Sequence, residues 1–221
     1  PEMLLAAKKD RTIRRVLSTM SVLIPDGIGI TLMSFFTGQG ICPRYPGVDF
    51  FIELCGLANE TKETVLLLGG WGKDAETACK VLKKVFPNVN FKAIGEIEIR
   101  YENGEWHQPI DLLENIRSQS PTIIAVALGG GNNDRQERWV AEFANKIPSL
   151  KVAVGVGGAI DMISGKIPRA PEIMRTAGLE WAWRLIIEPK RIGRIFNAVV
   201  VFPFYAFWDR VKHISGGKKH D

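Results

Sequence analysis

An aspartate in a turn is the first side chain of this sequence that could do chemistry. Asp26 stands in the stretch Leu23-Ile24-Pro25-Asp26-Gly27-Ile28-Gly29. The apolar run 22–24 predicts a short buried strand, and the proline and glycine predict a turn before the next helix. A carboxylate at a strand end of an open α/β sheet lies where ligands bind, so Asp26 is a candidate general base or metal ligand. The alternative is that Asp26 only caps the helix that follows.

Glycine clusters follow three other apolar segments. They are Gly69-Gly70, Gly129-Gly130-Gly131 and Gly157-Gly158. Glycines after strands let phosphate groups approach backbone N–H groups at helix N-termini, so Gly69 and Gly157 are candidate contacts to a nucleoside diphosphate. No cluster forms a GxGxxG or Walker sequence, and such turns also occur in this fold class without a ligand.

The elements that must position these residues alternate along the chain. Strands are predicted over 64–68, 91–94, 122–128 and 151–156, and helices over 2–20, 29–37, 48–58, 74–85, 110–118, 138–146 and 159–163. Each of these strands is almost entirely apolar, which is typical of a parallel sheet covered on both faces. We therefore expect residues 1–168 to form an α/β core with a Rossmann-like, mostly parallel sheet between helices.

The sequence changes character after residue 168. Residues 166–221 hold 11 Lys and Arg against 5 Asp and Glu, whereas residues 1–165 hold 18 against 19. Basic and aromatic residues together predict that 169–221 form a helical appendage that binds an anionic membrane surface. The candidate docking cations are Arg184, Lys190, Arg191 and Arg194. The alternative is an ordinary helical pair packed on the sheet. Nucleic acid is not an expected partner, because no groove-reading motif accompanies the basic residues.

Composition excludes several other classes of protein. With 221 residues, 46% of them hydrophobic, the chain can bury a full core. Its three cysteines lack metal-ligand spacing and do not suit a disulfide framework, which indicates a reducing compartment. Its three histidines lie far apart, so we expect no structural metal. No cofactor is expected either. No segment is typical of a signal peptide or a membrane-spanning helix.

A set of short motifs, taken in order, resembles the WecB/TagA/CpsF family of bacterial glycosyltransferases. The resemblance extends from residue 1 to about residue 210. The motifs are Pro1-Glu2-Met3, Pro25-Asp26-Gly27-Ile28-Gly29, Gly47-Val48-Asp49, Leu66-Leu67-Leu68-Gly69-Gly70, Arg135-Gln136-Glu137-Arg138-Trp139, Gly155-Val156-Gly157-Gly158-Ala159-Ile160-Asp161, Arg169-Ala170-Pro171, Gly178-Leu179-Glu180-Trp181, Arg184-Leu185 and Glu188-Pro189-Lys190-Arg191.

The resemblance implies an inverting, metal-independent transfer of a hexose, N-acetylmannosamine or a related sugar. The donor would be a UDP-sugar and the acceptor a polyprenyl-diphosphate-linked saccharide in cell-surface polysaccharide or teichoic acid biosynthesis. The enzyme would be cytoplasmic and peripheral on the inner face of the cytoplasmic membrane. The base would be Asp26, the aspartate of the PDG motif, and Arg44, Asp49 and Gln136 would contact ligand.

Two interpretations remain open for each of three polar residues. Gln136 and Glu137 follow a predicted strand end and could hydrogen-bond sugar hydroxyls, or they could form the polar first turn of a helix. Asp161 could contact ligand or cap backbone N–H groups.

The chain departs from the family pattern at two places. Residues 129–137 are longer than the family's G-x-P-K-Q-E segment and lack its proline, which bears on the choice of donor sugar. The family also has a T-x-N segment before the Pro-Glu pair with which this sequence opens, so we expect a strand of the core to lie upstream.

Two other functions agree with the same residues. One is a soluble nucleotide-sugar enzyme whose C-terminal helices are an ordinary cap, because fold alone does not fix function. The other is a non-catalytic, membrane-peripheral scaffold. This alternative is suggested by the altered segment 129–137. Self-association into a homo-oligomer is compatible with each of them.

Overall fold

The computed structural model describes residues 1–221 except 39, 41, 130–133 and 209–221. The chain divides into two units. Unit 1 consists of Pro1–Arg14, Val22–Pro46 and Arg169–Asp221, and unit 2 consists of Arg15–Ser21 and Gly47–Pro168.

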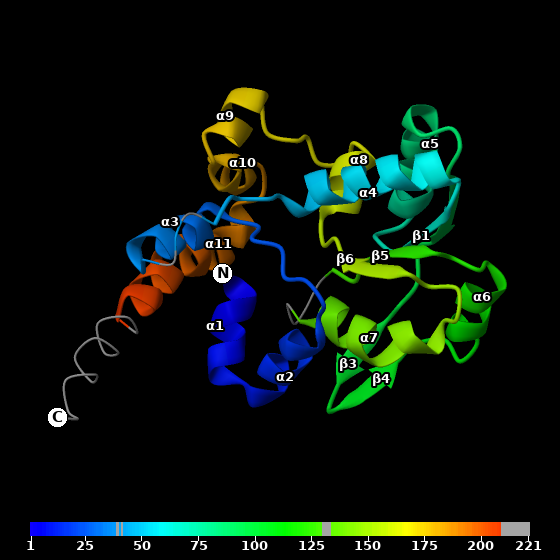
Figure 1. Cartoon of the computed structure of the whole chain (residues 1–221), viewed down its shortest axis with the longest axis horizontal. Helices are drawn as coiled ribbons and strands as arrows, with labels where there is room; N and C mark the ends of the chain where they lie inside the picture. The colour runs from blue at the N-terminus through cyan, green and yellow to red at the C-terminus, as the bar shows by residue number, and fades with distance from the viewer. Residues whose placement is uncertain (39, 41, 130–133, 209–221) are drawn as a thin grey trace. The chain divides into compact units, whose positions relative to one another are not determined.

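Unit 2 is built on a parallel sheet with the strand order β2-β1-β5-β6 (Figure 1). Its strands are β1 (Thr64–Gly69), β2 (Asn90–Ile94), β5 (Ile123–Ala127) and β6 (Val152–Gly155). In this register Leu66 lies opposite both Lys92 and Ile124. The four strands predicted from apolar runs are confirmed, and so is their parallel pairing. Strand β2 pairs with one edge of β1, and β5 pairs with the other edge. The topological switch point of the sheet therefore lies between β1 and β5.

Helices cover both faces of this sheet. One layer contains α4 (Gly47–Thr61), α5 (Asp74–Val85) and α8 (Ala159–Ile163), and the other contains α6 (Leu112–Ser118) and α7 (Arg135–Phe143), which is followed by the 3-10 turn η1 (Ala144–Lys146). Successive side chains of a strand point to opposite faces. Val65 and Leu67 therefore pack in the first core, and Leu66 and Leu68 in the second, all fully buried.

A hairpin that the sequence analysis missed precedes α6. Its strands β3 (Arg100–Glu102) and β4 (Glu105–His107) pair antiparallel across the Asn103-Gly104 turn, whose φ angles of 53° and 87° are both positive. Asn-Gly between two short strands favours such a turn, and this signal was available in the sequence. The Trp106 indole N–H donates to a Glu142 carboxylate oxygen at 2.6 Å, so the hairpin packs on α7.

The regular secondary structure in the described part of unit 1 is helical. It contains α1 (Glu2–Lys9), α3 (Ile28–Phe36), α9 (Glu172–Thr176), α10 (Glu180–Ile187), the 3-10 turn η2 (Pro189–Arg191), α11 (Ile192–Phe196) and the π-helical turn η3 (Asn197–Val201), and helical conformation continues over 202–208. The π turn precedes Pro203, which has no N–H to bond the carbonyl four residues back. None of the described helices is both long and apolar enough to cross a bilayer.

Two predictions about the N-terminal segment are wrong. The single helix predicted over 2–20 is two helices, α1 and α2 (Arg11–Thr19), because Asp10 is extended and its carboxylate accepts the Thr12 N–H at 2.7 Å. The run 22–24 is not a strand, and Val22 and Leu23 are 73% and 56% exposed. A strand is stabilised by pairing, and the described part of the sheet contains no partner for this segment.

Candidate functional site

Asp26 lies in the loop that leads into α3, not at the end of a strand. Its side chain is exposed, and its N–H donates to the Ile24 carbonyl at 2.9 Å. The N-cap position of α3 belongs to Gly27, whose φ of 133° suits glycine. Asp26 is therefore one residue outside the helix, and the capping position predicted for it is occupied by its neighbour.

Arg44 is brought next to the Asp26 loop within unit 1. The Tyr45 N–H donates to the Pro25 carbonyl at 3.0 Å, so the residues before Tyr45 and after Pro25 lie on adjacent segments. The structure holds this guanidinium largely buried: Nη2 donates to the Arg175 carbonyl at 3.0 Å, and Nη1 lies 3.6 Å from a Glu180 carboxylate oxygen.

Gly69, the last residue of β1, is required by the packing of the sheet. Gly69 has a φ of 95°, and a Cβ atom there would lie 2.5 Å from the Ala127 carbonyl oxygen. The Gly70 N–H donates to that same oxygen at 3.0 Å. A glycine is thus required where β1 closes against β5, and the contact between Gly69 and a ligand stays a prediction.

Gln136 and Gly157 meet at the carboxyl end of β6. Gln136 lies in the first turn of α7, and its Oε1 accepts the Gly157 N–H at 2.9 Å. This bond fixes the amide, so that the Nε2 group, which is a donor only, is the part left for another partner. The sequence predicted both residues for a site, and the structure brings them together across 21 positions of the chain.

Glu137 is a buried carboxyl group beside the same strand end. Its Oε1 lies 3.4 Å from the point where a Cβ on Gly155 would stand. Its Oε2 is buried and has no hydrogen-bond partner within the described part of the chain. Burial raises the pKa of Glu137, and the neighbouring negative charge of Asp134 adds to this rise. The group therefore holds its proton to a higher pH than an ordinary glutamate and can donate a hydrogen bond while protonated.

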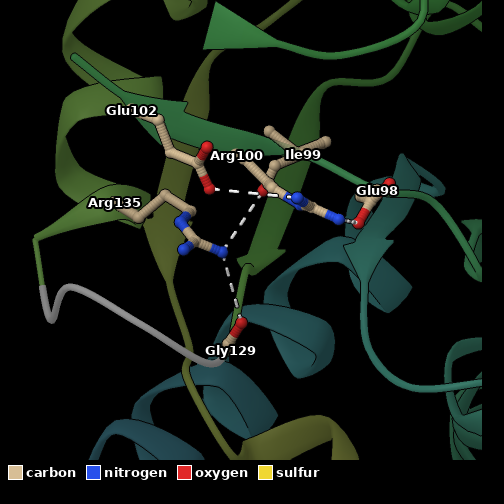
Figure 2. Close-up of polar contacts among 6 residues, drawn as sticks. All are labelled: Glu98, Ile99, Arg100, Glu102, Gly129 and Arg135. Atoms are coloured by element: carbon tan, nitrogen blue, oxygen red, sulfur yellow. Dashed lines mark hydrogen bonds and ion pairs between the residues drawn. The ribbon is translucent and has the colours of Figure 1, made fainter. Parts of the chain in front are cut away.

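Arg135, which the sequence analysis did not select, anchors the start of α7. Figure 2 shows its guanidinium between two backbone carbonyls, with Nη1 at 3.3 Å from the Ile99 oxygen and 3.5 Å from the Gly129 oxygen. These contacts join the exit of β5, the approach to the hairpin and the first turn of α7. Residues 130–133 of the glycine-rich loop, which the sequence analysis compared with the family pattern, lie outside the described residues.

A cleft lies elsewhere in unit 2, beside the hairpin. Its volume is about 390 Å³, and it is lined by Glu98, Arg100, Glu102, His107, Gln108 and Pro109. Arg100 is paired with both glutamates (Figure 2). None of the predicted site residues that the structure describes lines this cleft, whereas Gln136 and Glu137 lie at the end of β6.

The remaining predicted ligand contacts lie in first turns of helices of unit 2. Asp49 is in the first turn of α4 and Asp161 in the first turn of α8, both partly buried. Among the described residues no group of three His, Cys, Asp or Glu side chains is placed to hold a metal ion, and metal independence stays a prediction.

The three cysteines are free thiols. Burial raises the pKa of Cys55 and of Cys79 to about 12, so both are unreactive thiols at neutral pH.

Two of the four predicted docking cations are paired inside unit 1. Arg184 contacts the Glu188 carboxylate at 2.7 Å, and Arg194 contacts Glu2 at 2.9 Å, which raises the pKa of Arg194. Lys190 is exposed, and the Arg191 side chain lies outside the described residues. The role of these residues at a membrane stays a prediction.

Comparison with known proteins decides the class of this chain. Residues 1–216 match the sequence profile of the Glycosyl transferase WecG/TagA/CpsF family. The chain belongs to this family. The resemblance found in the motifs is thereby confirmed, and the WecG/TagA/CpsF member described here is a glycosyltransferase.

Three of its curated relatives carry the enzyme name N-acetylglucosaminyldiphosphoundecaprenol N-acetyl-beta-D-mannosaminyltransferase. The relative from Bacillus subtilis (strain 168) is 32% identical over 197 residues, which cover 89% of this chain and 73% of the relative. The relative from Staphylococcus aureus (strain MRSA252) is 30% identical over 205 residues, which cover 92% of this chain and 76% of the relative. A third, from Bacillus spizizenii, is 29% identical over 197 residues, which cover 89% of this chain and 72% of the relative.

Proposed function

We propose that this enzyme transfers N-acetylmannosamine, or a closely related hexose, from a UDP-sugar to a saccharide linked to polyprenyl diphosphate, with inversion at the sugar carbon. The observation that carries the proposal is the match over most of the chain to relatives named for transfer of an N-acetyl-beta-D-mannosaminyl group to N-acetylglucosaminyldiphosphoundecaprenol. A β product formed from an α-linked UDP-sugar requires inversion. The product would serve the synthesis of a cell-surface polysaccharide or teichoic acid.

Asp26 is the proposed catalytic base. Inverting transfer requires that the acceptor hydroxyl lose its proton as its oxygen attacks the sugar carbon. An ionised carboxylate can accept that proton, and the exposed position of Asp26 outside α3 leaves the carboxylate accessible to an acceptor. The bond to the departing UDP breaks on the opposite side of the sugar as the new bond forms.

Arg44 is the proposed partner of the departing diphosphate. A guanidinium binds phosphate oxygens through paired N–H donors, and its positive charge stabilises the charge that develops on the leaving group. The contacts to Arg175 and Glu180 hold this side chain in place. Such preorganisation lowers the entropy lost when the transition state forms.

Gln136 and Glu137 are the proposed contacts to the donor sugar. The Gly157 N–H holds the Gln136 carbonyl, so its NH₂ group would donate to a sugar or phosphate oxygen. Glu137, which keeps its proton to a higher pH, would donate from a buried position to a hydroxyl or acetamido oxygen. Asp49 and Asp161 would accept hydrogen bonds from sugar hydroxyls, and Gly69 would contact the donor at the end of β1.

The enzyme would act from the cytoplasmic side, bound peripherally to the membrane that carries its acceptor. Exposed aromatic residues and Lys190 of unit 1 support this placement. Binding to the surface that holds the polyprenyl chain raises the effective concentration of the acceptor.

A transfer assay tests the proposal. The full chain is incubated with a panel of UDP-sugars and a short-chain, water-soluble analogue of polyprenyl diphosphate N-acetylglucosamine. Transfer is expected with UDP-N-acetylmannosamine, with a β linkage seen by NMR and with equal rates in the presence of EDTA. Binding of UDP without transfer from any donor would contradict the proposal and favour a scaffold. Release of free sugar without acceptor product would favour a soluble nucleotide-sugar hydrolase.

A further inference from the structure

Helix α3 is uncharged and leaves a large apolar face exposed. Residues 27–43 contain no Asp, Glu, Lys or Arg. Leu32, Phe35 and Phe36 share one side of the helix at i, i+3 and i+4 spacing and are 47%, 61% and 65% exposed. Exposed apolar patches of this kind mark sites of interaction.

The C-terminal helical segment lies beside α3 within unit 1 (Figure 1). A Cβ atom on Gly29 would lie 2.8 Å from the Ala198 carbonyl oxygen, so this glycine lets α3 approach η3 closely. The segment also leaves apolar side chains exposed, at Phe196, Val200 and Phe204. These three residues, together with Leu32, Phe35 and Phe36, are the surface discussed below.

The charges around this surface favour an anionic bilayer as its occupant. Residues 189–208 contain three basic residues and no acidic one; Arg194 is paired with Glu2 of α1, so Lys190 and Arg191 are the cations that this segment adds. The Lys8 ammonium of α1 lies 5.1 Å from the centre of the Tyr205 ring, which adds a cation at the side of the segment. Aromatic and aliphatic groups beside cations match the boundary between anionic headgroups and acyl chains. A second copy of the chain would instead bring like charges together, which is unfavourable.

We infer that α3 and the C-terminal segment bind an anionic phospholipid bilayer as one surface, with Leu32, Phe35 and Phe36 entering the headgroup boundary beside Phe196, Val200 and Phe204. This rests on the proposed function in one respect, because a lipid-linked acceptor requires the enzyme at a membrane. The sequence analysis assigned membrane contact to residues after 168 only, and α3 is the added element. Because α3 follows Asp26 directly, its insertion would hold the proposed base near the acceptor's headgroup.

Vesicle co-sedimentation of the full chain tests this inference. The vesicles contain phosphatidylglycerol and phosphatidylcholine, and the test variant is Phe35→Ser/Phe36→Ser. Its binding is expected to fall about tenfold or more, because two large apolar side chains no longer leave water. The matched control is Ile110→Ser/Ile173→Ser, which removes two exposed isoleucines outside the surface and should bind as the unaltered chain does. Circular dichroism and the thermal midpoint verify that both variants fold.

Several outcomes would overturn the inference. Equal vesicle binding by the test variant and the unaltered chain would show that α3 does not enter the bilayer. A dimer of the unaltered chain, seen by sedimentation velocity and lost in the test variant, with no vesicle binding, would assign the surface to self-association. Absence of vesicle binding with intact transfer to the water-soluble acceptor would overturn this inference alone. Vesicle binding that depends on Phe35 and Phe36, without transfer from any donor, would overturn only the proposed function.

Discussion

Substituting Gly69 by alanine tests how β1 and β5 close at the switch point of the sheet. Alanine must adopt a φ of 95°, a left-handed conformation that costs about 1–2 kcal/mol for a residue with a Cβ. Its Cβ would also lie 2.5 Å from the Ala127 carbonyl oxygen, and relieving such overpacking costs about 1–3 kcal/mol. Gly69→Ala should therefore lower the free energy of unfolding by about 2–5 kcal/mol.

The adjacent glycine provides the matched control. Gly70 has a φ of 90°, but the nearest atom to its Cβ position is 3.5 Å away, an ordinary contact. Gly70→Ala should lose only the backbone part, about 1–2 kcal/mol. Urea unfolding followed by tryptophan fluorescence and circular dichroism measures both variants. Equal losses would refute the reasoning, because the Ala127 contact would then contribute nothing.

Three further predictions concern single side chains. Glu137→Gln should flatten the pH dependence of the unfolding free energy. Because the pKa of Glu137 is raised in the folded state, the protonated carboxyl group stabilises the fold below a pH of about 4.3, the ordinary glutamate pKa. This contribution is lost as the pH rises through the folded-state pKa of Glu137. Equal pH slopes of the unfolding free energy in both proteins would contradict it. Arg44→Lys should lower the unfolding free energy by about 1–3 kcal/mol, because one ammonium cannot reproduce both guanidinium contacts, and unchanged urea midpoints would argue against this. Cys55 and Cys79 should react with a thiol reagent at neutral pH only after unfolding, and rapid labelling of the native chain would show otherwise.

The parallel sheet could be predicted because its strands carry their own signal. The run from Val65 to Leu68 is apolar at every position, as required of a strand buried on both faces. The same reasoning failed at Val22 and Leu23, because an apolar run also suits an exposed loop and only pairing distinguishes the two. The break at Asp10 and the hairpin at Asn103 were missed although both carry local signals.

The sequence predicted which residues belong to the candidate site, but it did not predict the contacts that these residues make. Motif resemblance selected Gln136 and Gly157, yet their hydrogen bond depends on how α7 packs against β6. Likewise, Arg44 meets the Arg175 carbonyl across 131 positions, which no local pattern encodes. Arg135 was passed over because its partners are backbone carbonyls, and these leave no trace in the sequence.

The transfer rate of Asp26→Asn tests the central claim most directly. The rate is measured in a single turnover with UDP-N-acetylmannosamine and the water-soluble acceptor, next to UDP affinity by calorimetry. The control is Asp111→Asn, which changes another exposed aspartate, at the start of α6. Loss of a general base should lower the Asp26→Asn rate by about 10²–10⁴-fold, with UDP affinity unchanged and the control fully active. A transfer rate for Asp26→Asn equal to that of the unaltered chain would contradict the account.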